Sequence, residues 1–184
     1  MIYSRTVKLK DGRSCTIRNG TEQDAEAVLE NFILTHGQTD YLTTYPEEIS
    51  YTIDQEKEYL KKKTESEREA ALVAEIDGVI AGTAGVDLIM NYEKTRHRAS
   101  FGISIREEWW GLGIGRALTE ACIECARAAG YLQMELEVVA DNRRAMSLYQ
   151  RAGFTEYGRN PLGFRSRRNG WQENVLMRLD LREE

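Results

Sequence analysis

The stretch ISIREEWWGLGIGRALTEACIECARAAG, residues 103–130, begins as an apolar strand pattern and continues as a helical one. Between the two patterns, glycine stands at positions 111, 113 and 115. Backbone amides at the start of a helix bind anions, because their N–H groups are free and the helix dipole adds positive charge. Glycine also lets the backbone approach a phosphate closely. The stretch therefore predicts a diphosphate-binding loop, with a plain flexible turn as the alternative.

Two other phosphate-binding motifs do not fit this stretch. The dinucleotide fingerprint Gly-x-Gly-x-x-Gly needs a third glycine where this chain has Arg116, and it opens a long run of alternating strands and helices. Too little sequence follows position 116 for such a sheet. The nucleotide-triphosphate loop requires Gly-Lys-Ser/Thr, which does not occur here. Neither nucleotide-binding fold is therefore expected.

Patterns on both sides of the glycines predict the remaining elements. Period-two alternation and turn residues predict strands within 6–20, as a hairpin around Asp11-Gly12, and at 70–76, 79–89, 99–105, 132–139 and 175–181. Helical spacing predicts helices over 21–33, 52–66, from the glycines to Gly130, and 141–153, and both prolines, Pro46 and Pro161, fall in expected loops. The order indicates one α+β domain over residues 1–184. Its central mixed sheet is mostly antiparallel, is flanked by helices and contains one parallel crossover.

Composition limits the classes of protein that the chain can represent. Hydrophobic residues make up 41% and charged residues 30% of the 184 positions, as in soluble globular proteins. The net charge of −5 argues against nucleic acid as a partner. The first residues contain no apolar run long enough for a signal peptide or a membrane span, and the three cysteines are an odd number. We expect reduced thiols and a cytoplasmic protein without a membrane partner.

Two motifs together resemble the GCN5-related N-acetyltransferase (GNAT) family, which transfers an acetyl group from acetyl-CoA to an amine. In that family a strand ending in a bulge leads into Gln/Arg-x-x-Gly-x-Gly/Ala, and residues 110–115 match this motif with Trp110 at the Gln/Arg position. The family's second motif, Asn-x-x-Ala-x-x-Leu-Tyr-x-x-x-Gly-Phe, is matched in full over residues 142–154. The resemblance covers about residues 98 to 157.

The resemblance implies a GNAT-type fold, in which a β-bulge and splayed strands bind acetyl-CoA as the acetyl donor and no metal takes part. It implies that the amides of the glycine loop hold the CoA pyrophosphate and that the preceding strand pairs with the pantetheine arm. Asn142 can also simply cap its helix. The residues implied for cofactor binding are Ile103, Ser104, Ile105, Trp110, Gly111, Leu112, Gly113, Ile114, Gly115, Arg116, Ala117, Asn142 and Tyr149.

The resemblance also suggests the acid and the base of the reaction. It places Tyr149 beside the CoA sulfur, and a tyrosine is protonated at neutral pH and can donate to a leaving thiolate. A core-packing role for Tyr149 is the alternative. A neutral amine is needed for attack, so a base or a water relay must accept a proton. Glu137 is the candidate base because family members that act on protein N-termini have a glutamate at this place, although a solvent-facing role remains open. His97 and Glu108 are the next candidates.

Three functions remain open at this point. The first is an acetyl-CoA-dependent N-acetyltransferase acting on a primary amine, either a small molecule or a protein N-terminus. The second is a catalytically silent module that binds or senses acyl-CoA, and the third is an acyltransferase with a hydroxyl acceptor. The partner is an amine acceptor, and a homodimer stays open. A site for a cationic amine is suggested by Tyr41, Tyr45, Tyr51, Glu47 and Glu48.

Three further groups of residues have simple structural interpretations. Cys122 and Cys125 lie within a helix without a second pair, so we expect two small buried side chains and no zinc site. The three lysines at 61–63 are expected on a solvated helix face. The arginines before the last strand are expected in a solvated loop, with contact to CoA phosphates or to an acidic substrate as the alternative; they are Arg159, Arg165, Arg167 and Arg168.

Overall fold

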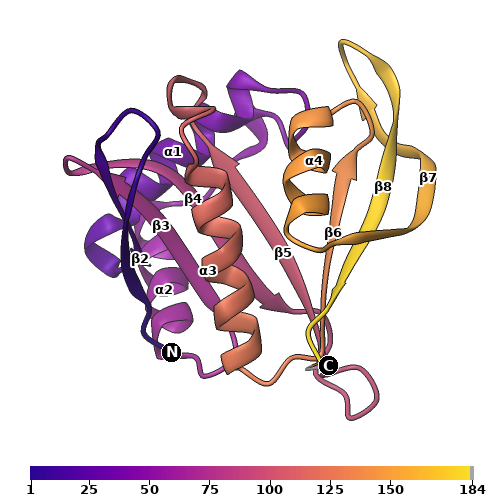
Figure 1. Cartoon of the computed structure of the whole chain (residues 1–184). Coiled ribbons are helices and arrows are strands. Elements are labelled where there is room, and N and C mark those ends of the chain that lie inside the picture. The colour runs from indigo at the N-terminus through magenta and orange to yellow at the C-terminus, as the bar shows by residue number, and fades with distance from the viewer. Residues whose placement is uncertain (183–184) are drawn as a thin grey trace.

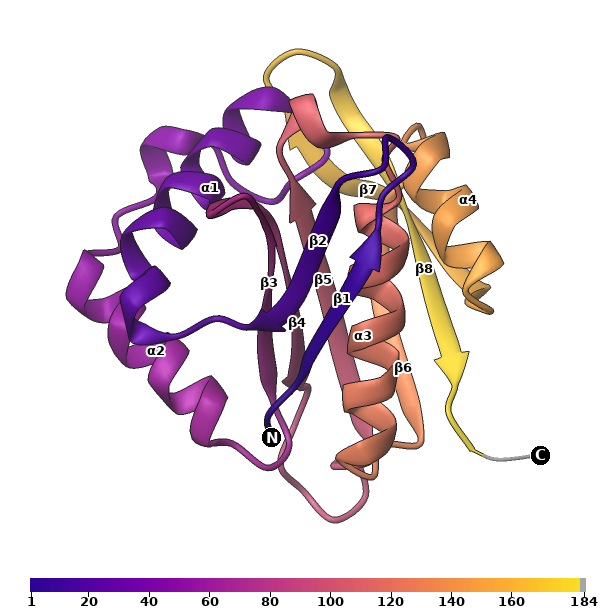
Figure 2. The same ribbon diagram turned by 60° about the vertical axis from the view of Figure 1, so that its left-hand side comes forward.

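One open mixed sheet of eight strands carries the fold in the computed structural model, which describes residues 1–182. Two helices cover each face of the sheet (Figures 1 and 2). The elements in chain order are β1 (Ser4–Lys8), β2 (Ser14–Asn19), α1 (Ala25–Gln38), α2 (Ile53–Glu65), β3 (Ala70–Ile76), β4 (Val79–Leu88), β5 (Arg98–Ile105), α3 (Ile114–Ala128), β6 (Gln133–Val139), α4 (Arg143–Arg151), β7 (Thr155–Ser166) and β8 (Gly170–Asp180). Short 3-10 turns lie at Glu22–Asp24, Pro46–Glu48 and Glu107–Trp109.

The sheet has the strand order β1-β2-β3-β4-β5-β6-β8-β7. Every neighbouring pair is antiparallel except β5 and β6, which are parallel and are joined through α3. The predicted mixed, mostly antiparallel sheet with one parallel crossover is therefore confirmed. Antiparallel neighbours need only short turns, whereas the parallel pair requires a long crossover, which α3 supplies.

Local signals place the ends of these elements close to their predicted positions. Asp77 and Gly78 both have positive φ, +50° and +80°, and turn β3 back into β4. Thr52 caps α2 by accepting a hydrogen bond from the Gln55 amide. Gly130, with φ +76°, follows the end of α3. Residues with these short-range preferences act alike in most contexts, which is why the sequence alone located them.

The segment before the last strand was predicted wrongly as a loop. It forms the edge strand β7, which includes Pro161, and its partner β8 begins at Gly170 instead of residue 175. The β7–β8 register shifts between Glu156 and Gly158 and again between Asn160 and Phe164. A proline and two irregularities are tolerated at a sheet edge because one side of the strand has no hydrogen-bonding neighbour. These features hide the strand from a period-two pattern.

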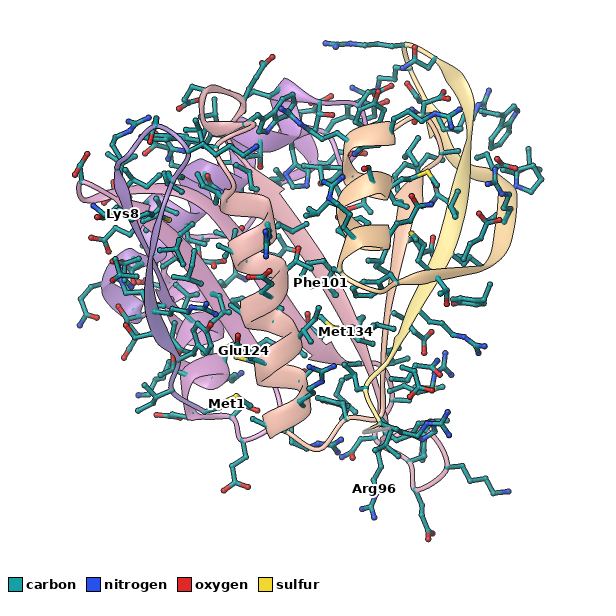
Figure 3. The ribbon with its side chains drawn as sticks, viewed as in Figure 1. Met1, Lys8, Arg96, Phe101, Glu124 and Met134 are labelled. Atoms are coloured by element: carbon teal, nitrogen blue, oxygen red, sulfur yellow. The ribbon has the colours of Figure 1, made fainter. Side chains whose placement is uncertain are left out.

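Two apolar cores lie on opposite faces of the sheet. The larger is under α3 and α4, where Phe101 on β5 and Met134 on β6 are both buried (Figure 3). The smaller is under α1 and α2 and centres on Leu60 and Val73. Figure 2 shows the two helix pairs on either side of the strands. Among residues 1–182, none of the helices combines the length and the apolar character needed to cross a lipid bilayer.

The start of α1 is anchored by an ion pair between Arg18 and Asp24. Arg18 donates to both carboxylate oxygens of Asp24, at 2.7 and 2.8 Å, and to Glu75 at 2.6 Å. The guanidinium holds the pKa of Asp24 at about 2. The unfolded carboxylate has a pKa near 3.9, so the contact contributes about 2 kcal/mol above pH 4 and is lost as the pH falls from about 4 to about 2.

Asp24→Asn is therefore expected to lower the free energy of unfolding by about 2 kcal/mol at pH 7 and to flatten its decline below pH 4. Urea denaturation at pH 7, 4 and 2.5 measures both effects. Glu22→Gln, in the same turn, is the control because its carboxylate forms no ion pair with any of residues 1–182. An Asp24→Asn variant whose stability declines with pH as steeply as that of the unmodified protein would contradict the assignment.

Candidate active site

The central cleft of the molecule opens where β5 and β6 separate. The two strands pair only at Arg98–Gln133, Ala99–Met134 and Ser100–Glu135. Beyond these positions β5 continues beside β4 to Ile105, while β6 continues beside β8 to Val139. The splay leaves a cleft of about 1940 Å³ that reaches both faces of the sheet. The strand β5 pairs with β4 without a register shift, whereas the pairing of β3 with β4 has one beside Ala74 and Glu75.

The glycine loop lies at the open end of β5, directly before α3 (Figure 1). Gly111 and Gly113 have φ values of +82° and +105°, which only glycine adopts readily, and Gly113 caps α3. Within residues 1–182, no acceptor receives a hydrogen bond from the six amides of residues 111–116; the first amide of this segment with a partner is that of Ala117, bonded to Gly113 O. Six free donors at a helix N-terminus form a site for an anion.

Trp110 has a structural role at the end of the open strand edge. Its Nε1 donates to the Ile105 carbonyl oxygen at 2.7 Å, and the Arg144 guanidinium lies 5.1 Å from the centre of its rings. Gly115 packs tightly, because a Cβ there would lie 3.2 Å from Leu148 and 3.3 Å from Ile105. These contacts hold the glycine loop against β5 and α4.

Tyr149 lines the same cleft from α4 and is otherwise buried. Its ring packs against Phe101 and Phe154, with centres 5.9 and 6.0 Å away. Its hydroxyl has no hydrogen-bond partner within residues 1–182, although it is not sealed from the cleft. Burial raises the pKa of Tyr149, so the phenol keeps its proton at neutral pH. Tyr149 thus has the packing contacts that the sequence analysis gave as the alternative, and its hydroxyl is free to meet a ligand in the cleft.

Comparison with known proteins decides the family. The sequence model described as "Acetyltransferase (GNAT) family" matches residues 34–154, which is more than half of the chain. The chain belongs to the GNAT family. This confirms the resemblance drawn from the two motifs, and the fold agrees with it. A GNAT-family acetyltransferase from Streptococcus pneumoniae superposes with a TM-score of 0.84 at 27% identity, over 89% of this chain and 97% of that one.

Two relatives found by sequence match shorter parts of the chain. An uncharacterized N-acetyltransferase of Methanocaldococcus jannaschii is 29% identical over 146 residues, 78% of this chain and 62% of its own length. An L-amino acid N-acyltransferase of Escherichia coli is 28% identical over 61% of this chain and 64% of its own length. The chain therefore spans less than two thirds of these relatives. A Salmonella typhimurium structure that contains its cofactor acetyl-CoA has the same fold, with a TM-score of 0.80 at 22% identity over 92% of this chain and 95% of that one.

The other residues implied for cofactor binding fall into two groups around the GNAT cleft. Those that line it are Ile103, Ser104, Ile105, Trp110, Gly111, Gly113, Ile114, Gly115, Arg116 and Asn142. Leu112 and Ala117 do not; both side chains pack against the larger core. Asn142 also caps α4 by accepting a hydrogen bond from the Ala145 amide at 3.2 Å. The capping role is thus present, and the amide nitrogen of its side chain remains for a ligand.

Glu137 is the one candidate base that reaches the cleft. Its side chain is exposed on β6, and the buried Asn174 donates to its Oε2 at 3.2 Å. Glu108 is exposed on the turn before the glycines and does not line the cleft. His97 lies at the opposite end of β5 from the glycine loop, next to Arg96 at the bottom of Figure 3. The geometry therefore favours Glu137 over both alternatives.

Five basic side chains lie near the glycine loop, and the sequence analysis had named only Arg116 among them. These residues line the cleft at its α3 and α4 end: Lys10, Arg116, Arg143, Arg144 and Arg151. The paired arginines at the start of α4 were a visible signal. The arginines predicted to be in a loop before the last strand do not line the cleft. Arg159 pairs with Glu156 and Glu173, and Arg167 pairs with Glu47.

Two other expectations have clear outcomes. Cys122 and Cys125 are buried free thiols, as expected, and burial raises the pKa of both. Lys63 is not solvated as predicted: it is buried and forms ion pairs with Glu69, at 3.1 Å, and with Asp87. Within residues 1–182, His, Cys, Asp and Glu side chains do not form a group of three or more that could hold a metal ion.

Proposed function

We propose that this protein is an acetyl-CoA-dependent N-acetyltransferase whose acceptor is a primary amine, on a small molecule or at a protein N-terminus. One observation carries the proposal: six unpaired amides lie at the end of a strand whose edge is open, in a cleft that also contains a buried tyrosine with a free hydroxyl. A diphosphate fits the amides, and an extended chain fits the open edge of β5 as an added strand.

Two side chains of the cleft have the chemistry that acetyl transfer needs. Acetyl-CoA, when bound, supplies a thioester whose carbonyl carbon an amine nitrogen can attack, with formation of a C–N bond and cleavage of the C–S bond. Tyr149 donates its proton to the leaving sulfur, and its phenolate regains through solvent the proton that the nitrogen loses as the amide forms. Glu137 accepts a proton from the amine, directly or through water, so that the nitrogen has a free electron pair. The basic side chains at the other end of the cleft suit the phosphates of CoA.

Release of CoA thiol from acetyl-CoA in the presence of a panel of amines tests this function. The panel contains alkylamines, diamines, amino acids and a peptide with a free N-terminus. We expect release that depends on one class of amine, together with an acetylated product detected by mass spectrometry. Tight binding of acetyl-CoA without release for any amine would support the catalytically silent module instead.

Glu137→Gln tests the base, because the amide keeps the shape of the side chain and removes its basicity. Acetylation is expected to slow by about 10²-fold at pH 7. The loss is expected to shrink as the pH rises, because a larger fraction of the amine is then already neutral. Between pH 8 and 10 this recovery is steeper for a lysine-like amine, with a pKa near 10.4, than for an α-amine near 8.

The measurement is the rate of acetylation as a function of pH. Glu173→Gln is the matched control, because Glu173 pairs with Arg159 and does not line the cleft. If Glu137→Gln and the unmodified protein have the same pH–rate profile, then Glu137 is not the base.

A further inference from the structure

The two halves of the cleft carry opposite charge. We call the part of the cleft next to the glycine loop and α4 the donor half, and the part next to α1, α2 and Glu137 the acceptor half. The donor half contains the basic side chains near the glycine loop. On the α1 and α2 side, one lysine lines the cleft, Lys62, and it is 2.8 Å from the carboxylate of Glu58. His36 on α1 also lines this side, but burial lowers its pKa and favours the neutral ring. Within residues 1–182, the acceptor half therefore lacks a free cation. A carboxylate on the acceptor would lose its hydration there without gaining a partner.

Two carboxylates of the acceptor half are themselves without a cation. Among the described residues, 1–182, the carboxylate of Glu137 accepts a hydrogen bond from Asn174 and from no other group. Glu56, on α2, is partly buried, its carboxylate forms no hydrogen bond or ion pair within residues 1–182, and burial raises its pKa. A third carboxylate, that of Asp87, is already compensated by Lys63. An acceptor with two positive charges would supply what Glu56 and Glu137 lack.

Aromatic rings line the space around Glu56. Phe32 and Tyr51 stand edge to face with their ring centres 6.4 Å apart, and Tyr59 lies on the same side of the cleft. Burial raises the pKa of Tyr59, and the carboxylates of Asp87 and Glu56 raise it further. The Lys63 Nζ lies 5.3 Å from the centre of the Tyr59 ring, so this environment already accommodates one cation, and the negative potential favours another. On the sheet, Gly102 has no side chain and leaves open space, since a Cβ there would meet no atom within 4 Å.

A set of hydrogen bonds joins the α1–α2 connection to the tip of the β7–β8 hairpin, close in sequence to Leu42 and Phe164, which line the cleft. Asp40 accepts from Asn169 at 2.6 Å and from Ser166, while the Tyr45 hydroxyl accepts from the Arg167 amide at 2.7 Å. Three of the five residues predicted at an amine site take part in these contacts instead. Glu47 pairs with Arg167, and Glu48 accepts a hydrogen bond from the Tyr45 amide. Of the five, Tyr41 and Tyr51 line the cleft. This bridge favours a small acceptor over a polypeptide.

We propose that the acceptor is a small amine with a second positive charge and no carboxylate, such as an α,ω-diamine, with one nitrogen at Glu137 and the other held by Glu56 and the surrounding rings. This inference rests on the proposed function. It makes Glu56 a specificity residue for the second charge, since its carboxylate is separate from the reacting atoms.

Three series of equal chain length test the proposal on the full-length protein with acetyl-CoA: diamines, monoamines and ω-amino acids of three to eight carbons. A peptide with a free N-terminus is the fourth arm. We expect kcat/KM to be highest for diamines, with an optimum at one length, and at least about tenfold lower for monoamines. Glu56→Gln is expected to lower kcat/KM about tenfold for the best diamine and to leave the monoamine of that length unchanged.

Asp54→Asn on α2 is the control, because it removes one negative charge from an exposed position outside the cleft. Turnover of ω-amino acids or of the peptide in preference to diamines would overturn this inference and leave the proposed function intact. An equal loss for diamine and monoamine in Glu56→Gln would also overturn it. Binding of acetyl-CoA with no turnover in any arm would overturn both.

Discussion

Replacement of Gly113 by valine is expected to weaken acetyl-CoA binding by at least about 10²-fold. Gly113 has φ +105°, which a β-branched residue cannot adopt without strain, and it caps α3 with its amide free. A side chain at this position would also project into the cleft over the neighbouring amides, because a Cβ there meets no atom within 4 Å. The substitution therefore changes both the direction of the amides and their access to the diphosphate.

Gly130→Val is a matched control for this loss. Gly130 also has positive φ, +76°, also has open space beside its Cβ position, and follows the opposite end of the same helix. Both variants are expected to lose about 1–2 kcal/mol of stability from backbone strain. Calorimetric titration with acetyl-CoA and thermal unfolding measure the two effects. Unchanged affinity in folded Gly113→Val would remove the glycine loop from the donor site.

Replacement of Tyr149 by phenylalanine is expected to slow acetyl transfer by about 10²- to 10⁴-fold, the range typical of a lost general acid. The variant keeps the ring and its contacts with Phe101 and Phe154, so the fold and the affinity for acetyl-CoA are expected to change little. The hydroxyl that it removes has no partner within residues 1–182, so no hydrogen bond of the fold is lost.

Tyr131→Phe is the control for removal of a buried phenol, because the Tyr131 hydroxyl is also unpartnered and Tyr131 does not line the cleft. Single-turnover measurements with acetyl-CoA bound separate the chemical step from donor binding. If Tyr149→Phe has the same turnover as the unmodified protein, Tyr149 serves only to pack α4 against the sheet.

Much of the donor half of the site could be predicted from the sequence because it depends on short stretches of chain. Gly111 and Gly113 need positive φ wherever they occur, and a strand followed by these glycines and a helix presents free amides by local geometry alone. The same holds for the Asp77-Gly78 turn and for the helix stops at Gly130 and Gly153. Each of these signals involves residues close together in sequence.

The acceptor half could not be predicted in this way because its residues meet only through the tertiary structure. Glu56 and Glu137 lie 81 positions apart, and although the family resemblance pointed to Glu137, the sequence did not distinguish Glu56 from the other glutamates around it. The sequence suggested Tyr45 and Glu47 for the amine, but both contact Arg167 at the tip of the β7–β8 hairpin. The edge strand β7 that carries this tip was itself hidden by Pro161 and two register shifts.

The sequence by itself determined the local elements, their order and the anion site at the start of α3, since backbone conformation and capping act over a few residues. Only the tertiary structure decided which carboxylates are left without a cation. Lys63 is drawn into the interior by Asp87 and Glu69, and Lys62 is held by Glu58, so that Glu56 remains unpaired. Which charges form ion pairs depends on the distances between side chains of α2, of Glu69 just before β3, and of β4. These distances exist only after the chain has folded.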